Sequence, residues 1–274
     1  MAAQPIYDDD DGEDEVIRLI VQAESDLEGE PVAEEDTCPP TPEGVEAAPL
    51  AEVEAAPGLI TVDKLDGVPL FYARGPGAPA KHKFAFEPTF HDECVAVIRS
   101  VRHRVPASYG NLTRITTAGT FVNKDGMHGD GRAMDHDRWQ FEHVDIHPFK
   151  HDHASADPKR RRRYWALAAI MRSHSAFLLH GEYNDAHKDH LHHDNGGKFA
   201  FDTSSPATVK LVQAICRHIF GSTEVEIDGD YGAKSKAAVK TALAKVELAG
   251  DITDPTVFKR FLMRSGRLGF VLGA

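Results

Sequence analysis

The stretch Asn184-Asp185-Ala186-His187-Lys188-Asp189-His190-Leu191-His192-His193-Asp194 combines an alternating strand pattern with side chains that metal sites use. Along an extended strand, successive side chains point to opposite faces. His190 and His192 therefore project to one side, while Leu191 and His193 project to the other. We expect one histidine of the pair His190 and His192 to bind a metal ion and the other to transfer protons.

A second histidine segment lies upstream, Met127-His128-Gly129-Asp130-Gly131-Arg132-Ala133-Met134-Asp135. It places six residues between a histidine and a carboxylate, and its glycines let the backbone turn and approach closely. Imidazole and carboxylate ligands together suit Zn²⁺, and a catalytic zinc site has three protein ligands and an open fourth position. The sequence predicts such a site from His128, Asp135 and a histidine of the 184–194 stretch.

Most of the other histidines in this region are predicted to be solvated or to bind metal only adventitiously. Twelve of the 16 histidines lie between His128 and His193, and a histidine-rich run needs no function of its own. The residues interpreted in this way are His136, His143, His147, His151, His153, His174 and His193.

The chain around the two segments has the pattern of an α+β domain. Short apolar runs and helix-like stretches follow one another between residues 59 and 202, and we expect a small antiparallel sheet flanked by helices there. Beyond Ser204 the pattern becomes helical, which predicts a small three-helix module over 203–274. The predicted helices cover 93–102, 164–174, 209–220, 235–248 and 255–264.

The N-terminal segment has a different composition. Residues 1–58 contain 18 acidic residues against the single basic residue Arg18, while the remainder has 25 acidic residues and 30 Lys and Arg. With few aromatic side chains, 1–58 has too little apolar surface to offset the entropy of ordering, so we expect a disordered acidic tail. For its short apolar cluster over 16–21, a transient helix is favoured over a docking helix or an export signal.

The two histidine segments resemble the bacterial extensin-like C-terminal domain family, which is related to the D-Ala-D-Ala carboxypeptidases and other LAS-type zinc peptidases. The likeness covers about residues 90 to 195. From the first family motif the sequence has His128, Gly131, Ala133 and Asp135. From the second it has Gly181, Tyr183, Asn184, Ala186, His187, Asp189, His190, His192 and Asp194.

The resemblance implies a Zn²⁺ ion held by His128, Asp135 and His192. It gives His190 a role beside the metal, as a proton acceptor or as a hydrogen-bond donor to the tetrahedral intermediate. Asp189 competes for the role of base, because related enzymes place an acidic base three residues before the last ligand. The strand parity favours His190. His187 is expected to support the ligands.

The sequence departs from the family pattern in two places. Gly126-Met127 replaces the Ser-Glu that precedes the first ligand, and Phe121-Val122-Asn123-Lys124 stands where the family has Tyr-x-Cys-Arg. Lys124 is therefore expected to substitute for an arginine that stabilises developing oxyanion charge, although Lys lacks the planar fork of Arg. These departures concern the orientation of substrate more than metal binding.

The C-terminal segment resembles the peptidoglycan-binding modules found beside many wall hydrolases. The match runs over 225–239 and includes the turn residues Asp228, Gly229, Tyr231 and Gly232. Taken alone, this turn is typical of a connection between two helices. Beside a wall-peptidase motif, the resemblance favours wall binding.

Together these resemblances imply a zinc-dependent peptidoglycan peptidase, either a carboxypeptidase or an endopeptidase. The alternative is a non-catalytic wall-binding or particle-associated protein, whose metal site would be closed by a fourth ligand from His187 or His180. A nucleic-acid partner through the basic run 159–163 is disfavoured, because no aromatic residues are interleaved with it.

The location of the protein is predicted from what the sequence lacks. It shows no secretory signal and no apolar run of membrane-spanning length, and its three cysteines indicate no disulfide framework. We therefore expect synthesis in the cytoplasm and action at the cell wall or periplasm after non-classical delivery. The delivered form would be an effector or a phage-type lysin. Residues 1–58 are the expected contact with a secretion or contractile injection apparatus.

Overall fold

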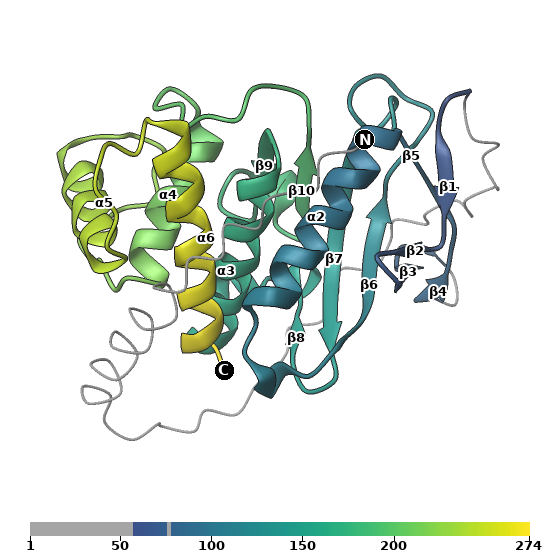
Figure 1. Cartoon of the computed structure of the whole chain (residues 1–274), viewed down its shortest axis with the longest axis horizontal. Helices are drawn as coiled ribbons and strands as arrows, with labels where there is room; N and C mark the ends of the chain where they lie inside the picture. The colour runs from purple at the N-terminus through teal and green to yellow at the C-terminus, as the bar shows by residue number, and fades with distance from the viewer. Residues whose placement is uncertain (1–56, 76–77) are drawn as a thin grey trace, which may run out of the picture.

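A computed structural model describes residues 57–75 and 78–274 of the chain (Figure 1). The acidic tail predicted over 1–58, with its apolar cluster over 16–21, lies outside these residues except for its last two positions. The predicted α+β class is confirmed, because the described residues form five α-helices and a large mixed sheet.

The fold consists of short strands, α-helices and 3₁₀ helices, the last labelled η. In chain order they are β1 (Ile60–Val62), β2 (Lys64–Leu65), β3 (Val68–Tyr72), β4 (Ala80–Lys81), β5 (Phe84–Phe86), α2 (Pro88–Arg104), η1 (Ala107–Tyr109), β6 (Leu112–Gly119), β7 (Ala133–Phe141), β8 (Asp145–Ile146), η2 (Pro148–Lys150), η3 (Asp152–Ala154), α3 (Pro158–His174), β9 (Phe177–Leu179), η4 (Asp185–His187), β10 (Leu191–Asp194), α4 (Pro206–His218), α5 (Ala233–Lys245) and α6 (Pro255–Leu272).

Four of the helices begin in the same way, with a capping side chain followed by a proline. Asp157 and Asp254 accept hydrogen bonds from backbone N–H groups of the first helical turn, and each is followed by proline. A side-chain acceptor satisfies an orphan N–H group, and proline has no N–H to leave unpaired at that position. The two other pairs of this type are Glu87-Pro88 and Ser205-Pro206.

The main sheet has the strand order β2-β3-β6-β7-β10-β9, with β4 added to β3 and β8 added to β7. All of its pairs are antiparallel except β3 with β6, so the sheet is larger than predicted and is mixed. The parallel pair arises because α2 carries the chain back along the sheet before β6 begins. β1 and β5 form a separate two-stranded sheet.

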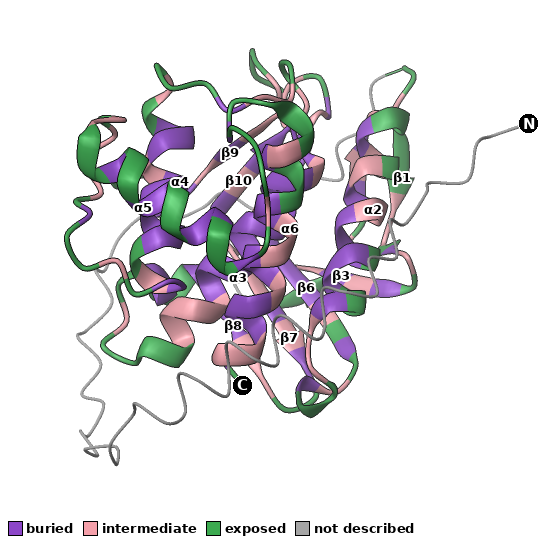
Figure 2. Ribbon diagram, turned by 60° about the vertical axis from the view of Figure 1, so that its left-hand side comes forward, coloured by how far each residue is buried: buried purple, intermediate pink, exposed green. Residues whose placement is uncertain are grey.

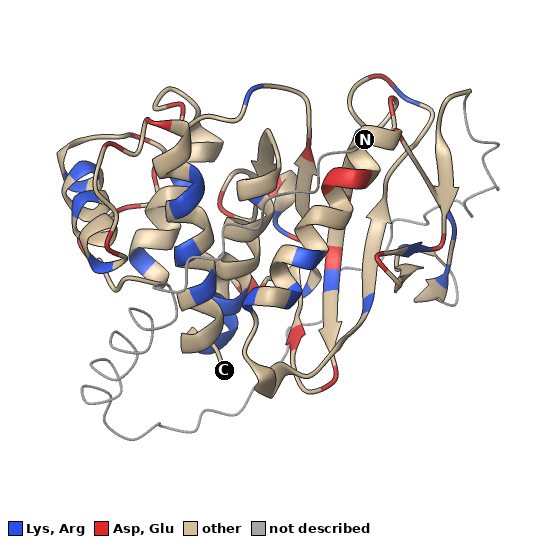
Figure 3. Ribbon diagram, viewed as in Figure 1, with Lys and Arg blue, Asp and Glu red and all other residues tan. Residues whose placement is uncertain are grey.

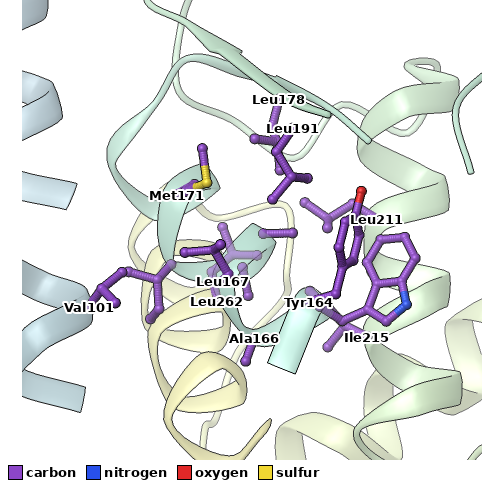
Figure 4. Packing of buried hydrophobic residues seen from close by; sticks show 14 of the residues in the cluster. Val101, Tyr164, Ala166, Leu167, Met171, Leu178, Leu191, Leu211, Ile215 and Leu262 are labelled. Atoms are coloured by element: carbon purple, nitrogen blue, oxygen red, sulfur yellow. The ribbon is translucent and has the colours of Figure 1, made fainter. Parts of the chain in front are cut away.

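Helix α3 is the centre of the hydrophobic core. Every residue from Tyr164 to Ser173 is buried, which Figure 2 shows as a nearly continuous buried stretch. Its apolar side chains meet Val101 of α2, Leu191 of β10 and Leu262 of α6 (Figure 4). The C-terminal helices therefore share a core with the sheet. The division of the chain at residue 203 into two units stays a prediction.

The basic run at the start of α3 lies against the end of α6. Lys159, Arg162 and Arg163 donate hydrogen bonds to the backbone carbonyls of Ala274, Leu272 and Gly273. In Figure 3 the ribbon positions of Lys and Arg gather where these two helix ends meet. Cations stabilise the carbonyl end of a helix, so this run has a structural role in the fold. None of the described helices is both long enough and apolar enough to cross a membrane.

Candidate metal centre

The pairing of β7 with β10 brings two of the predicted ligands together. His192 lies directly opposite Asp135 in this antiparallel pair. Directly opposed residues project to the same face of a sheet. The His192 Nδ1 atom consequently lies 2.8 Å from Oδ1 of Asp135, although the two residues are far apart in the sequence.

The third predicted ligand comes from the loop between β6 and β7. His128 is buried, with 8% of its surface exposed, and its Nε2 atom lies 3.2 Å from Oδ2 of Asp135 and 3.3 Å from Nδ1 of His192. Gly131 allows the loop to return to β7, because its φ of +68° lies in the region that favours glycine. The ligand atoms of the three residues all lie within 4.8 Å of one another.

Hydrogen bonds on the far side of each imidazole select the nitrogen that faces the site. Nδ1 of His128 donates to the backbone carbonyl of Thr120 at 2.6 Å, which turns Nε2 toward Asp135. Nε2 of His192 donates to the Asp194 carboxylate at 3.1 Å, which turns Nδ1 toward Asp135. Ligating histidines ordinarily have such partners, which set the tautomer and raise the basicity of the ligand.

The electrostatics of the group favour a cation between the ligands. Burial would lower the pKa of His192, but the carboxylates of Asp135 and Asp194 outweigh it and raise the pKa to about 9. Burial would likewise raise the pKa of Asp135, but hydrogen bonds from His128 and His192 hold it well below its ordinary value. In the metal-free protein a proton on His192 offsets one of the two carboxylate charges, and a metal ion would replace that proton.

The donor set and its spacing fit a metal ion. Zinc bound tetrahedrally at about 2.0 to 2.2 Å places its ligand atoms roughly 3.4 Å apart. Nε2 of His128 lies 3.2 Å from Oδ2 of Asp135 and 3.3 Å from Nδ1 of His192, which is close to that spacing. Nδ1 of His192 lies 2.8 Å from the other oxygen of Asp135. The buried cluster of His128, Asp135 and His192 can therefore hold a metal ion.

Among the described residues, no fourth His, Cys, Asp or Glu joins this group of ligands. His187 donates from Nδ1 to Oδ1 of Asn184, and its ring centroid lies 6.0 Å from that of His192. His180 is fully buried and bonds through Nε2 to the carbonyl of Ala207. The described part of the chain thus leaves a coordination position to solvent or substrate.

His190 and Asp189, the two residues predicted to act beside the metal, lie at the edge of the three-residue cluster and contact each other. Nε2 of His190 is 3.7 Å from Oδ1 of Asp135, and its Nδ1 donates to Oδ1 of Asp189 at 2.7 Å. Asp189 is also paired with Arg74, whose guanidinium lies 2.7 Å from its Oδ2. Burial would raise the pKa of Asp189, but His190 and Arg74 lower it far below its ordinary value.

Sequence reasoning missed Arg74 and its second partner, Asp137. Arg74 follows β3 and belongs to neither histidine motif, so no local pattern pointed to it. Asp137 did carry a signal, because it lies two residues after Asp135, and on a regular strand such residues face the same side. Lys124, predicted to supply the cation, lies in the β6–β7 loop with an exposed side chain.

The interpretation of the other histidines as solvated is wrong for three of them. His136, His153 and His193 are buried, with 2%, 5% and 0% of their surfaces exposed. His136 and His193 lie on the opposite face of β7 and β10 from the ligands, and Nε2 of His136 lies 2.9 Å from Nδ1 of His193. The alternation of the strands turns these neighbours of the ligands into the core.

The predicted wall-binding residues form the turn between α4 and α5. Gln213 holds this turn, because its amide nitrogen donates to Oδ1 of Asp228 and its amide oxygen accepts from N–H of Gly229. Gly229 has a φ of +86°, Gly232 caps the start of α5, and the Tyr231 ring packs edge-on against Phe201. These contacts give the turn a structural role, and wall binding stays a prediction.

The chain was compared with protein-family models, with curated proteins and with solved structures, and none of them matches it. The resemblance to the extensin-like family therefore stays a prediction based on its motifs. The metal centre rests on the positions of its three ligands and their partners.

Proposed function

We propose that this protein is a Zn²⁺-dependent peptidase that hydrolyses amide bonds in the stem peptide or cross-bridge of bacterial peptidoglycan. One observation carries the proposal. His128, Asp135 and His192 converge from two strands and a loop, and no fourth ligand from the described residues closes the site. Three protein ligands with a free position are typical of catalytic zinc sites, whereas structural sites are closed by four.

The residues around the site can supply the other parts of hydrolysis. Bound zinc would act as a Lewis acid on the scissile carbonyl and would lower the pKa of water to about 7. In this proposal His190 accepts a proton beside the ligands and passes it to the leaving amine. Support comes from its Nε2, which lies 3.7 Å from Oδ1 of Asp135, and from its Nδ1, which is held by Asp189. Asp189 is a poorer base, since both of its oxygens are already paired.

Mass spectrometry of muropeptides tests the proposal. Purified peptidoglycan is incubated with the zinc-loaded protein, and the products identify the bond that is cut. His192→Ala is expected to lose both zinc and activity, because it removes a ligand. His190→Ala is expected to retain zinc and lose turnover, typically by 10²- to 10⁴-fold for a proton-transfer residue. His143→Ala, at an exposed histidine, serves as the control.

Two outcomes would contradict the proposal. Full activity of the His192→Ala protein would show that this residue does not hold a catalytic metal. A wild-type protein that binds zinc and sediments with peptidoglycan, yet releases no product, would favour the non-catalytic wall-binding alternative.

A further inference from the structure

A continuous series of charged contacts leads from the core to the edge of the metal centre. Nε and one terminal nitrogen of Arg74 donate to the two oxygens of Asp137, at 3.0 and 2.7 Å. Its other terminal nitrogen donates to Oδ2 of Asp189 at 2.7 Å. Oδ1 of Asp189 in turn accepts the hydrogen of His190 Nδ1.

Asp137 is the buried end of this series. Only 1% of its surface is exposed, and burial raises its pKa above the ordinary value despite the opposing effect of Arg74. A buried carboxylate is costly unless it is paired, and the planar fork of arginine matches the two carboxylate oxygens. Arg74 is therefore held in one orientation by a residue that lies outside the set of three metal ligands.

An aromatic ring also fixes the position of the Arg74 guanidinium. Its guanidinium carbon lies 4.7 Å from the ring centroid of Phe149, so the ring covers one face. Asp137 occupies the bidentate edge, and Asp189 occupies the remaining terminal nitrogen. Because its donor groups are already paired with protein side chains, this arginine is suited to fix the position of another side chain rather than to bind a substrate.

We propose that Arg74, anchored by Asp137, is a positioning residue that acts through Asp189 to orient His190 at the metal centre. Arg74 holds one oxygen of Asp189, so the other is turned toward Nδ1 of His190. The imidazole then keeps its Nδ1 hydrogen on Asp189 and directs Nε2 toward Asp135. The kinetic part of this inference rests on the proposed peptidase function, but the contacts themselves do not.

The first test reads the imidazole directly and needs no activity. In nitrogen-15 NMR spectra of the full-length protein, the hydrogen on His190 Nδ1 is expected to be protected from exchange with solvent. Asp189→Asn identifies this resonance by its loss. Arg74→Lys keeps a positive charge beside Asp137 but cannot bridge both carboxylates, so it is expected to abolish the protection. Arg102→Lys changes an exposed arginine paired with Asp66 and should leave it intact.

The second test is a double-mutant cycle on peptidoglycan hydrolysis. Arg74→Lys is expected to lower kcat at least tenfold while KM changes less than about twofold, because an orienting contact is lost but no substrate contact. In the Asp189→Asn background the same substitution is expected to change kcat by less than about threefold, because coupled residues are not additive. Zinc content should equal that of the wild type in all variants.

The outcomes separate this inference from the proposed function. Protection of the His190 hydrogen that survives Arg74→Lys would overturn the inference whether or not the protein is a peptidase. Additive losses in the cycle, or a tenfold rise in KM, would overturn it by showing that Arg74 contacts the substrate. A protein without hydrolytic activity would refute the proposed function, and the NMR comparison would still decide the role of Arg74.

Discussion

At the scale of single residues, the candidate metal site depends on a carboxylate outside the three proposed ligands. Asp194 lies two residues beyond His192 on the same face of β10, and its Oδ2 accepts from Nε2 of that histidine. Its other oxygen accepts from N–H of Gly196 at 2.8 Å, which fixes the carboxylate in place. Asp194 thereby decides which nitrogen of His192 points at the site.

Asp194→Asn is expected to weaken zinc binding about 10- to 100-fold, as is usual for losing such a partner. The amide oxygen would keep the bond to Gly196, so its NH₂ group would turn toward Nε2 of His192. That contact disfavours the tautomer with a free Nδ1. Competition with a chromophoric chelator measures the affinity, and Asp185→Asn, at an exposed carboxylate, is the matched control. An unchanged affinity in Asp194→Asn would contradict this role.

The convergence of the three proposed ligands could be predicted from the sequence, whereas the residues that orient their neighbours could not. His128, Asp135 and His192 lie in two short motifs with interpretable spacing, and the strand alternation correctly separated His192 from His193. Arg74 meets Asp189 only because β3 ends and β10 begins beside the same site, although the two residues are 115 positions apart in the sequence. Contacts of that kind are set by the packing of the whole sheet and leave no local pattern.

At the scale of elements, α6 approaches α3 so closely that it needs glycines. A Cβ atom added to Gly269 would lie 2.9 Å from Cβ of Ala166 and 2.8 Å from Cδ1 of Ile219. Real Cβ atoms almost never come this close, and Ala166 cannot move without α3. The missing side chain therefore sets the distance between the two helices.

Gly269→Ala is expected to destabilise the protein by about 1 to 3 kcal/mol, because overpacking forces the helices apart. The sign is informative, since the same substitution at an unconstrained helical position gains up to about 1 kcal/mol. Urea unfolding at neutral pH measures the difference. Gly197→Ala is the control, because its added Cβ would meet only the Cβ of Ala176, at 4.0 Å. A more stable Gly269→Ala protein would refute this account of the packing.

For α2 and α3 the sequence predicted the existence of the helix better than its start. The apolar pattern placed the second helix at 164, but α3 begins at Pro158, and α2 likewise begins five residues before its predicted start. The first turn of α3 is polar and is not buried, so hydrophobic periodicity cannot detect it. In α2 a single buried residue, Phe90, precedes the predicted start. The pairs Glu87-Pro88 and Asp157-Pro158 were the usable signal. The parallel pairing of β3 with β6 depends on long-range packing and had no such signal.

At the scale of the whole molecule, several histidines are buried in the core, apart from those proposed as metal ligands. Burial lowers the pKa of both His153 and His180 to about 4. Each has an Nδ1 atom that is buried without a hydrogen-bond partner among the described residues. Protonating either one inside the fold would place a charge where nothing compensates it. The folded state therefore depends on keeping these rings neutral.

This dependence predicts acid sensitivity of the whole fold. Above pH 6.5 both states keep these histidines neutral, and the stabilising effect is complete. Between pH 6.5 and about 4 these histidines bind protons in the unfolded chain but stay neutral in the folded chain. The free energy of unfolding therefore falls as the pH falls. Each fully buried histidine contributes up to about 1.4 kcal/mol per pH unit in that window.

Urea unfolding at pH 7.5, 6.0 and 5.0, with a chelator present throughout, separates this effect from loss of metal. His180→Gln can still donate to the carbonyl of Ala207 but cannot titrate. The free energy of unfolding of this variant should therefore fall less steeply as the pH falls, and its slope should be smaller by up to about 1.4 kcal/mol per pH unit. His103→Gln, at an exposed histidine, should follow the wild type. Because the comparison uses slopes, it holds even where the substitution changes the stability at neutral pH. Equal slopes for His180→Gln and the wild type would mean that this ring does not resist protonation in the fold.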